Sequence, residues 1–187
     1  RMSTEAIADV LLPVVSAVLA AHTAGIVHRD LKPDNVIIAR DAEGERPVLL
    51  DFGISKILEG PRSTALTQVG QVVGTPYYMA PEQIRREEID ARADQYALGV
   101  ILFECSTGVR PFRTEQSLFV LMAEILLGQP PLPSRLEASI PPAFEHLILR
   151  AMAARREDRF PSVEALGRAL LPFASSDMCR RWARSFG

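Results

Sequence analysis

The sequence predicts a single domain that is mainly α-helical and carries a few short β-hairpins. Apolar residues recur at three- and four-residue steps in several separate segments, which is the period of an amphipathic helix. Two short β-type runs, at residues 36–38 and 48–50, flank a charged turn, as expected for a small hairpin. The chain has 187 residues, which is enough for one core and too few for two full domains.

Composition excludes several classes of protein. Hydrophobic residues make up 48% of the chain and charged residues 24%, as in a folded globular domain rather than a disordered one. The net charge of −2 predicts no bulk attraction to nucleic acid or to anionic membranes. Cys105 and Cys179 form no CxxC pattern, which disfavours a zinc site or a disulfide framework and favours a cytoplasmic setting. The apolar stretch 10–21 is too short to span a membrane, so no membrane segment is expected in this chain.

The first half of the chain predicts one helix, short β-type segments and a long loop. The helix should begin near Ser3 or Thr4 and end at Gly25, and Pro13 should kink it or remove one hydrogen bond. A further β-type run is expected at residues 26–27, ahead of the hairpin. Residues 54–78 have no sustained period, and a loop of this length in a compact domain is usually functional or disordered.

The second half should be helical. Residues 96–105 are nearly all apolar, which predicts a helix buried on every side. Three amphipathic segments follow, around 118–125, 144–152 and 163–171, and proline-rich joints separate them. Residues 175–187 contain three arginines, and we expect a frayed tail there rather than a functional basic patch.

Three polar motifs carry the chemistry. They read His-Arg-Asp-Leu-Lys-Pro-Asp-Asn at 28–35, Asp-Phe-Gly at 51–53 and Ala-Pro-Glu at 80–82. One such triplet alone would indicate only a turn or a backbone cap. In this order and spacing, however, they resemble the signature set of the protein kinase family. The resemblance covers about residues 7–171.

The residues of these motifs are similar to those of bacterial Hanks-type serine/threonine kinases, and they resemble the C-terminal lobe of such kinases. The resemblance implies a protein-kinase-like C-terminal lobe (α+β) over residues 1–173, with a catalytic loop at 28–35 and an activation segment at 51–82. Residues 174–187 would form a C-terminal tail. The implied activity is the phosphorylation of serine or threonine on protein substrates, with ATP and Mg²⁺ as cofactors and Mn²⁺ as an alternative to Mg²⁺.

The resemblance assigns the chemical roles. Asp30 would accept or orient the proton of the substrate hydroxyl, and Lys32 would contact the γ-phosphate. Asn35 and Asp51 would supply the oxygen ligands of the metal. The remaining nucleotide contacts would come from Asp34 and from Ile37, the latter beneath the adenine ring.

Structural roles are implied for five further residues. His28 and Phe52 would pack in the hydrophobic stack that holds the catalytic loop. Asp94 would hydrogen-bond the backbone of that loop. Glu82 would pair with Arg159 in a buried carboxylate–guanidinium contact.

Regulatory roles follow from the activation segment. Arg29 would receive a phosphate placed on that segment, with Thr64 and Thr67 as the favoured acceptors. Thr75 would hydrogen-bond toward Asp30 and Lys32. Serine/threonine specificity is implied by Lys32 and by the segment 74–82.

The family's glycine-rich loop, strand lysine and glutamate partner have no counterpart in the sequence. We therefore expect the N-terminal lobe to be absent from this chain and to be its partner in an active parent kinase, which could be membrane-anchored outside this segment. Alone, the chain should have little or no activity. A non-catalytic kinase-like scaffold remains an alternative. A small-molecule phosphotransferase is disfavoured by the Ala-Pro-Glu motif at 80–82 and the threonine-containing segment before it.

Overall fold

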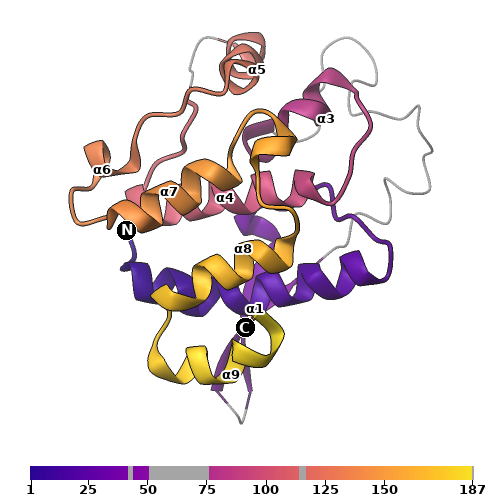
Figure 1. The fold of residues 1–187 in the computed structure, drawn as a ribbon. Coiled ribbons are helices and arrows are strands. Elements are labelled where there is room, and N and C mark those ends of the chain that lie inside the picture. Colours follow the sequence, from indigo (N-terminus) through magenta and orange to yellow (C-terminus); the bar gives the residue numbers. More distant parts are fainter. Residues whose placement is uncertain (42–43, 51–75, 114–116, 187) are drawn as a thin grey trace.

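The computed structural model describes residues 1–41, 44–50, 76–113 and 117–186, and within these ranges the chain forms a helical body with one hairpin (Figure 1). The hairpin strands are β1 (Val36–Asp41) and β2 (Gly44–Leu49). The α-helices are α1 (Thr4–Thr23), α3 (Pro81–Arg85), α4 (Arg92–Thr107), α5 (Leu118–Leu127), α6 (Pro133–Leu136), α7 (Pro142–Ala151), α8 (Val163–Leu170) and α9 (Ser176–Phe186). Short 3-10 turns are η1 (Pro33–Asn35), η3 (Pro76–Tyr78), η4 (Arg156–Asp158) and η5 (Leu171–Phe173).

Helix α4 forms the centre of the core. Every residue from 93 to 103 is buried, which confirms the prediction of a helix buried on all sides. Gly99 permits this packing, because a Cβ at that position would lie 2.7 Å from the Met152 side chain and 2.9 Å from that of Ala151. The end of α7 therefore approaches α4 closely, and α1 contacts α4 as well.

Helix α1 is continuous through Pro13 and begins where the sequence predicts. Ser3 caps it by accepting a hydrogen bond from the Ala6 N–H at 3.2 Å, and Gly25 follows its end with a φ of 76°. Among the described residues, α1 is the one helix long and apolar enough to cross a membrane. Its residues Ile7, Leu12 and Val18 are nevertheless buried in the protein core, where α1 contacts α8 and β2.

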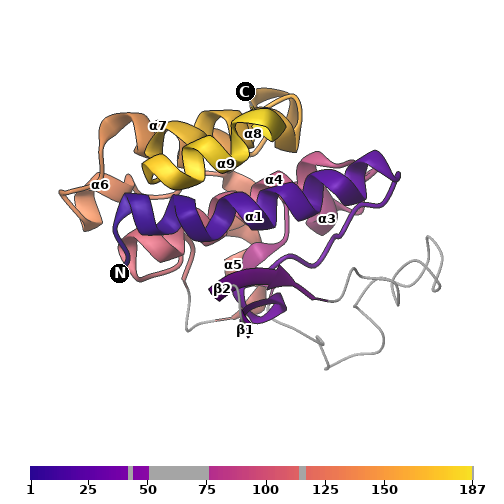
Figure 2. The ribbon, with the colours of Figure 1, turned by 90° about the horizontal axis from the view of Figure 1, so that it is seen from below.

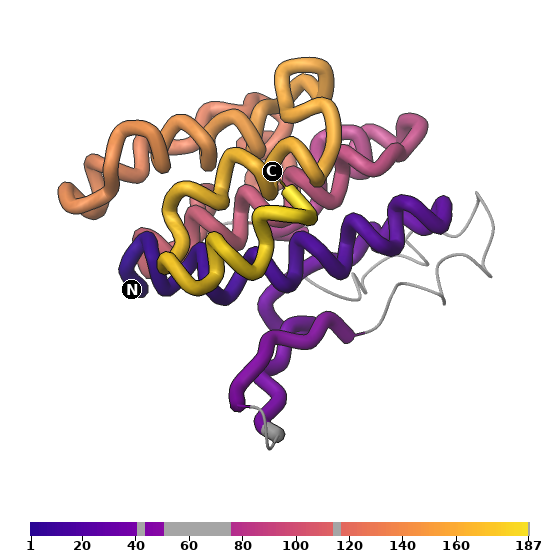
Figure 3. The backbone as a smooth tube through the Cα atoms, turned by 60° about the horizontal axis from the view of Figure 1, so that its bottom comes forward, coloured from indigo at the N-terminus to yellow at the C-terminus, as the bar shows by residue number. Residues whose placement is uncertain are grey.

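The hairpin lies on the side of α1 opposite α8 and α9 (Figure 2) and extends away from the helical body (Figure 3). Its antiparallel register pairs Val36 with Leu49 at the body and Asp41 with Gly44 at the tip. Leu49 packs in the core, whereas Ile37 and Ile38 are 44% and 50% exposed. The structure thus confirms the predicted hairpin, and it contains one hairpin in the described ranges.

Two sequence expectations are wrong. Residues 26–27 form no strand, because the Ile26 N–H bonds back to the Ala21 carbonyl at 2.9 Å and so completes the end of α1.

Residues 175–187 are not a frayed tail, since 176–186 form α9. Phe186 is fully buried there and contacts Gly167, where a Cβ would lie 2.5 Å from the Phe186 ring. A four-residue spacing of Met178, Trp182 and Phe186 places the apolar side chains on one face of α9.

Candidate active site

The loop 28–35 connects α1 to β1, and its start is held by the first turn of α4. The Asp94 carboxylate, which is 1% exposed, accepts the N–H of His28 on Oδ2 and the N–H of Arg29 on Oδ1, both at 2.9 Å. The predicted contact between Asp94 and the loop backbone is therefore present. Because both donors lie immediately before Asp30, the orientation of Asp30 depends on a buried carboxylate of the central helix.

His28 adds a second anchor. Its ring is buried, its Nδ1 lies 3.3 Å from the Asp30 nitrogen, and its Nε2 lies 3.2 Å from the Leu50 carbonyl oxygen. A backbone N–H only donates and a carbonyl only accepts, so in these contacts the Nδ1 of His28 accepts and its Nε2 donates. His28 therefore connects the backbone of Asp30 to the residue that follows β2.

Three of the predicted chemical residues lie together. The Lys32 Nζ is 3.6 Å from the Asp30 Oδ2, and both side chains are partly exposed. The Asn35 Nδ2 donates to the Asp30 carbonyl at 2.8 Å, which closes the loop on itself. Asp34 is exposed on η1, and Ile37 is exposed on β1. Asp30 and Lys32 thus present a carboxylate and an ammonium group to solvent from a loop whose backbone is fixed.

Asn35 fits the metal role that the sequence assigns to it. Because its amide nitrogen is used by the Asp30 carbonyl, the side-chain oxygen faces elsewhere, and within the described ranges no hydrogen bond to that oxygen is present. An amide oxygen is a ligand that suits a hard cation such as Mg²⁺. The second predicted ligand, Asp51, lies outside the described residues.

Arg29 has an unusual backbone that neighbouring groups hold in place. Its φ is 65°, a left-handed conformation that costs a non-glycine residue roughly 1 kcal/mol or more. Asp94 binds its N–H, and the Gln83 Nε2 donates to its carbonyl at 2.9 Å. Within the part of the chain that the structure describes, the buried Arg29 Nε has no hydrogen-bond partner, so this guanidinium retains capacity to bind an anion.

Glu82, at the start of α3, forms a bidentate contact with Arg159. The Arg159 Nη1 and Nη2 donate to the two Glu82 carboxylate oxygens at 2.7 Å and 2.8 Å, and the side chains are 0% and 3% exposed. Arg159 also donates to the carbonyls of Ala153 and Arg92. The contact expected from the sequence is present, and it fixes α3 to the segment between α7 and α8.

Sequence reasoning missed two residues that support the loop. His22, in the last turn of α1, places its Nε2 2.7 Å from the Asp94 Oδ2. Gln83 accepts the Ala80 N–H and donates to the Arg29 carbonyl, so it connects the Ala-Pro-Glu motif to the catalytic loop. The His22–Asp94 and Gln83–Arg29 contacts each join residues more than 50 positions apart, and no local pattern signals them.

The segment around η3 is fixed to the end of α4. The Tyr78 hydroxyl donates to Glu104 at 2.5 Å, and burial together with this contact raises the pKa of Tyr78 above its usual value. The Arg110 guanidinium lies 3.3 Å from Glu104 and 4.1 Å from the centre of the Tyr77 ring. Charge pairing and stacking therefore hold residues 76–78, close to α4.

The remaining predicted site residues fall outside the described ranges. These residues are Asp51, Phe52, Thr64, Thr67 and Thr75. Their assigned roles stay predictions.

Comparison with known proteins agrees with the geometry. Residues 1–171 match the protein kinase domain family. Over 90% of the chain, 45% of residues are identical to the serine/threonine-protein kinase Pkn1 of Myxococcus xanthus, and over 81%, 45% are identical to the serine/threonine-protein kinase pkn3 of the same species. The tyrosine-protein kinase MasK of M. xanthus is 40% identical over 90% of the chain. The chain spans about a quarter of the length of these curated relatives (24%, 28% and 25%). It belongs to the protein kinase domain family, in its bacterial Hanks-type branch.

Proposed function

We propose that the protein containing this chain transfers the γ-phosphate of ATP to serine or threonine on protein substrates. The observation that carries the proposal is the fixed loop on which Asp30, Lys32 and Asn35 lie together. Phosphoryl transfer needs positioning and charge neutralisation more than covalent help. Asp30 would orient the attacking hydroxyl and take up its proton, and Lys32 would offset charge on the transferred phosphate. Asn35 and Asp51 would hold Mg²⁺, which neutralises charge on the nucleotide phosphates.

Residues 1–173 would form the C-terminal lobe of the kinase domain. This assignment is supported by the order of the motifs and by the central position of α4 beneath the catalytic loop. The chain contains no G-x-G-x-x-G sequence to cover nucleotide phosphates. The exposed Ile37 on β1 would contact adenine only when another part of the parent protein closes over it. We therefore propose that efficient transfer requires the parent protein and that the isolated chain has little activity.

The activation segment would be controlled by phosphorylation. Arg29 stands next to Asp30 in sequence, its buried Nε has no hydrogen-bond partner among the described residues, and its backbone is held by Asp94 and Gln83. A phosphate on Thr64 or Thr67 would pair with this guanidinium and order the segment. Phosphopeptide mapping of the active parent should find one of these threonines modified, and an unmodified segment would contradict this part of the proposal.

The test uses the full-length parent kinase and intact-mass spectrometry after incubation with Mg²⁺ and ATP. We expect phosphate to be added to the parent and to a general protein substrate. Asp30→Asn and Asp51→Asn should each abolish the mass increments, whereas Asp177→Asn, on the exposed face of α9, should leave them unchanged. Phosphoamino-acid analysis should find phosphoserine or phosphothreonine. Because MasK is named as a tyrosine kinase, phosphotyrosine alone would overturn the assigned residue class.

The same assay on the isolated chain tests the lobe assignment. Phosphate added to the folded chain, and absent from its Asp51→Asn variant, would show that no further segment is needed. A folded parent that adds no phosphate to any substrate would instead favour a non-catalytic kinase-like scaffold.

A further inference from the structure

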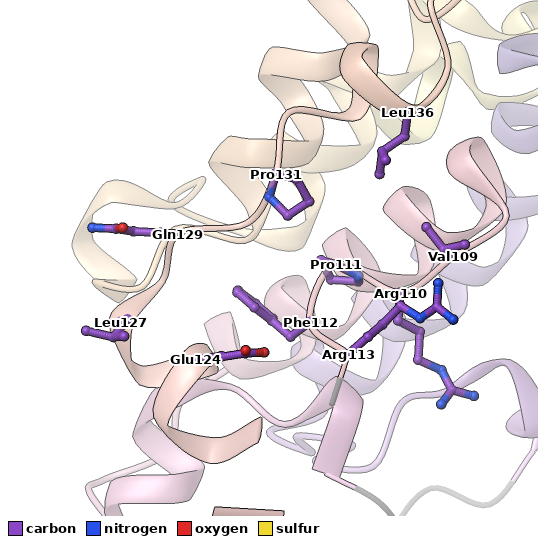
Figure 4. Close-up of a pocket in the computed structure, with 10 residues that line it drawn as sticks. All are labelled: Val109, Arg110, Pro111, Phe112, Arg113, Glu124, Leu127, Gln129, Pro131 and Leu136. Carbon is purple, nitrogen blue, oxygen red and sulfur yellow. The ribbon is translucent and has the colours of Figure 1, made fainter. Parts of the chain in front are cut away.

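A cavity of about 450 Å³ lies outside the catalytic loop, between the segment that follows α4, helix α5 and the residues before α6 (Figure 4). Phe112, Leu127, Pro131 and Leu136 supply apolar walls. In the close-up, Phe112, Pro131 and Leu136 lie around one space and Leu127 lies at its outer edge, and these residues come from three separate parts of the chain. The cavity is therefore formed by the fold and not by a single loop.

The cavity continues onto an exposed apolar face of α5. Phe119, Ala123 and Leu127 follow one another at four-residue steps, which places them on one side of the helix. Phe119 is 82% exposed and Leu127 is 70% exposed. Single exposed apolar residues need no explanation, but a contiguous apolar face beside a cavity marks an interaction surface. We call the cavity and this face together the α5 groove.

Arg110 connects the α5 groove to the segment proposed to bind substrate. Its side chain lines the cavity, and its guanidinium stacks over Tyr77 and pairs with Glu104. Glu104 in turn binds the Tyr78 hydroxyl. The groove is thus continuous with η3, which lies in the segment 74–82 to which the sequence assigns contact with the target residue. A polypeptide bound along η3 would therefore lie beside this surface.

The charges of the groove indicate what the bound segment should contain. The Arg110 guanidinium already forms an ion pair with Glu104. Arg113 is exposed and forms no ion pair with any other described residue. Across the cavity, Glu124 is the acidic group among the lining residues. The Arg113 guanidinium can therefore accept an acidic side chain at one edge, while the apolar walls accept a bulky apolar one.

We propose that the α5 groove docks a segment of the protein substrate in which a bulky apolar residue stands beside an acidic residue. The proposal rests on the proposed kinase function and adds a second point of contact with the substrate. Such docking would raise the affinity for the substrate without entering the chemical step. It would therefore act on KM and leave kcat unchanged.

Direct binding tests the groove independently of catalysis. Fluorescein-labelled peptides with a Phe-Asp core between Gly-Ser spacers are titrated with the chain, and the fluorescence anisotropy is recorded. We expect saturable binding of the Phe-Asp peptide and binding at least about tenfold weaker for Ala-Asp and Phe-Lys peptides, because each loses one of the two contacts. Equal binding of all three peptides, or none by any, would overturn the proposal.

Variants then locate the binding. Leu127→Ser and Arg113→Glu should each lower the affinity of the chain for the Phe-Asp peptide by about tenfold or more. The matched controls are Ile38→Ser, an exposed apolar residue on β1, and Arg155→Glu, an exposed arginine next to η4. Neither control should change binding. Loss of binding in the controls but not in the groove variants would place the site elsewhere.

Two further measurements separate the alternatives. Sedimentation velocity detects a second copy of the chain, and self-association abolished by Leu127→Ser would show that the groove is a homotypic interface and overturn the proposal. In the parent kinase, a substrate that carries the Phe-Asp segment should have a lower KM than one without it, and Leu127→Ser should remove the difference. An active parent with identical KM values would refute the docking role while leaving the kinase function intact.

Discussion

Breaking the buried Glu82–Arg159 pair should be among the most destabilising single changes in this fold. Arg159→Leu removes both donors to the Glu82 carboxylate, which is 3% exposed, and also the donors to the Ala153 and Arg92 carbonyls. A buried carboxylate left without its partner costs about 3–5 kcal/mol. That is a large share of the roughly 5–15 kcal/mol that stabilises a typical domain.

Urea unfolding followed by circular dichroism measures this cost. With a slope of about 3 kcal/mol/M, the loss should lower the unfolding midpoint by about 1–2 M urea. The matched control is Glu164→Ala, which breaks the exposed pair of Glu164 with Arg168 on α8, at 2.9 Å and with side chains 45% and 56% exposed. That change should cost only about 0.5 kcal/mol, because solvent screens the pair.

A double variant separates the penalty of an unpaired charge from the loss of packing. Glu82→Leu combined with Arg159→Leu removes both charges, so it should recover part of the stability that Arg159→Leu alone loses. The reasoning would be refuted if Arg159→Leu cost no more than the surface control, or if the double variant were less stable than the sum of the two single changes.

Three further predictions concern the loop anchor, the last helix and acid stability. Asp94→Asn keeps the size of the side chain but replaces one hydrogen-bond acceptor of the loop backbone by a donor. In steady-state kinetics, kcat of the parent kinase should fall by on the order of tenfold or more, with little change in the KM for ATP. Gly167→Ala should displace Phe186 and lower the free energy of unfolding by about 1–3 kcal/mol, and the amides of α9 should exchange hydrogen faster. In a Phe186→Ala background, the same change should have almost no effect on stability. The hydrogen bond from Arg92 lowers the pKa of Asp90. This pair therefore stabilises the fold above the usual aspartate pKa, and its contribution is lost as the pH falls through the lowered pKa. Asp90→Asn should make the free energy of unfolding slightly less sensitive to pH between about 5 and 3.

The sequence predicted those parts of the fold that depend on local pattern. The helical period located α1, α5, α7 and α8, a nearly continuous apolar run located α4, and β-type runs around a charged turn located the hairpin. The error at residues 26–27 has the opposite cause. Two β-branched residues favour a strand, but the end of α1 uses the Ile26 N–H, and helix termination outweighed local preference.

The last helix was missed because composition masked its pattern. Three arginines dominate residues 175–187, yet Met178, Trp182 and Phe186 share one face. What fixes that face is Gly167, whose missing Cβ leaves room for the Phe186 ring. A local pattern could have suggested the helix, but the space that receives it exists only once α8 is in place.

In the candidate site too, some residues could be predicted from the sequence and others only from the fold. Motif order located Asp30, Lys32 and Asn35, and it also predicted the contacts of Asp94 and Glu82 that the structure contains. His22 and Gln83 were not predicted, because each reaches the loop from a distant element. The residues with predicted chemical roles are marked by their neighbours in sequence, whereas the residues that hold their backbone are marked only by the fold.

His22 tests this distinction, because among the described residues it hydrogen-bonds Asp94 and not Asp30, Lys32 or Asn35. Its side chain is 9% exposed, and its Nε2 lies 2.7 Å from the same carboxylate oxygen that accepts the His28 N–H. His22→Ala removes one of the three groups that contact the Asp94 carboxylate among the described residues. We expect a loss of about 1.5–3 kcal/mol in the free energy of unfolding, the range for a hydrogen bond to a charged group.

The more specific readout is the catalytic loop itself. If His22 positions the loop through Asp94, His22→Ala should speed hydrogen exchange at the amides of His28 and Arg29 and lower kcat of the parent kinase, with little change in the KM for ATP. His22→Gln should rescue both, since its amide nitrogen can donate to Asp94 from a similar place. The exposed His146 on α7 provides the control, and His146→Ala should change neither quantity. Unchanged exchange at His28 and Arg29 in His22→Ala would mean that Asp94 holds the loop without His22, and that His22 serves only the stability of α1 against α4.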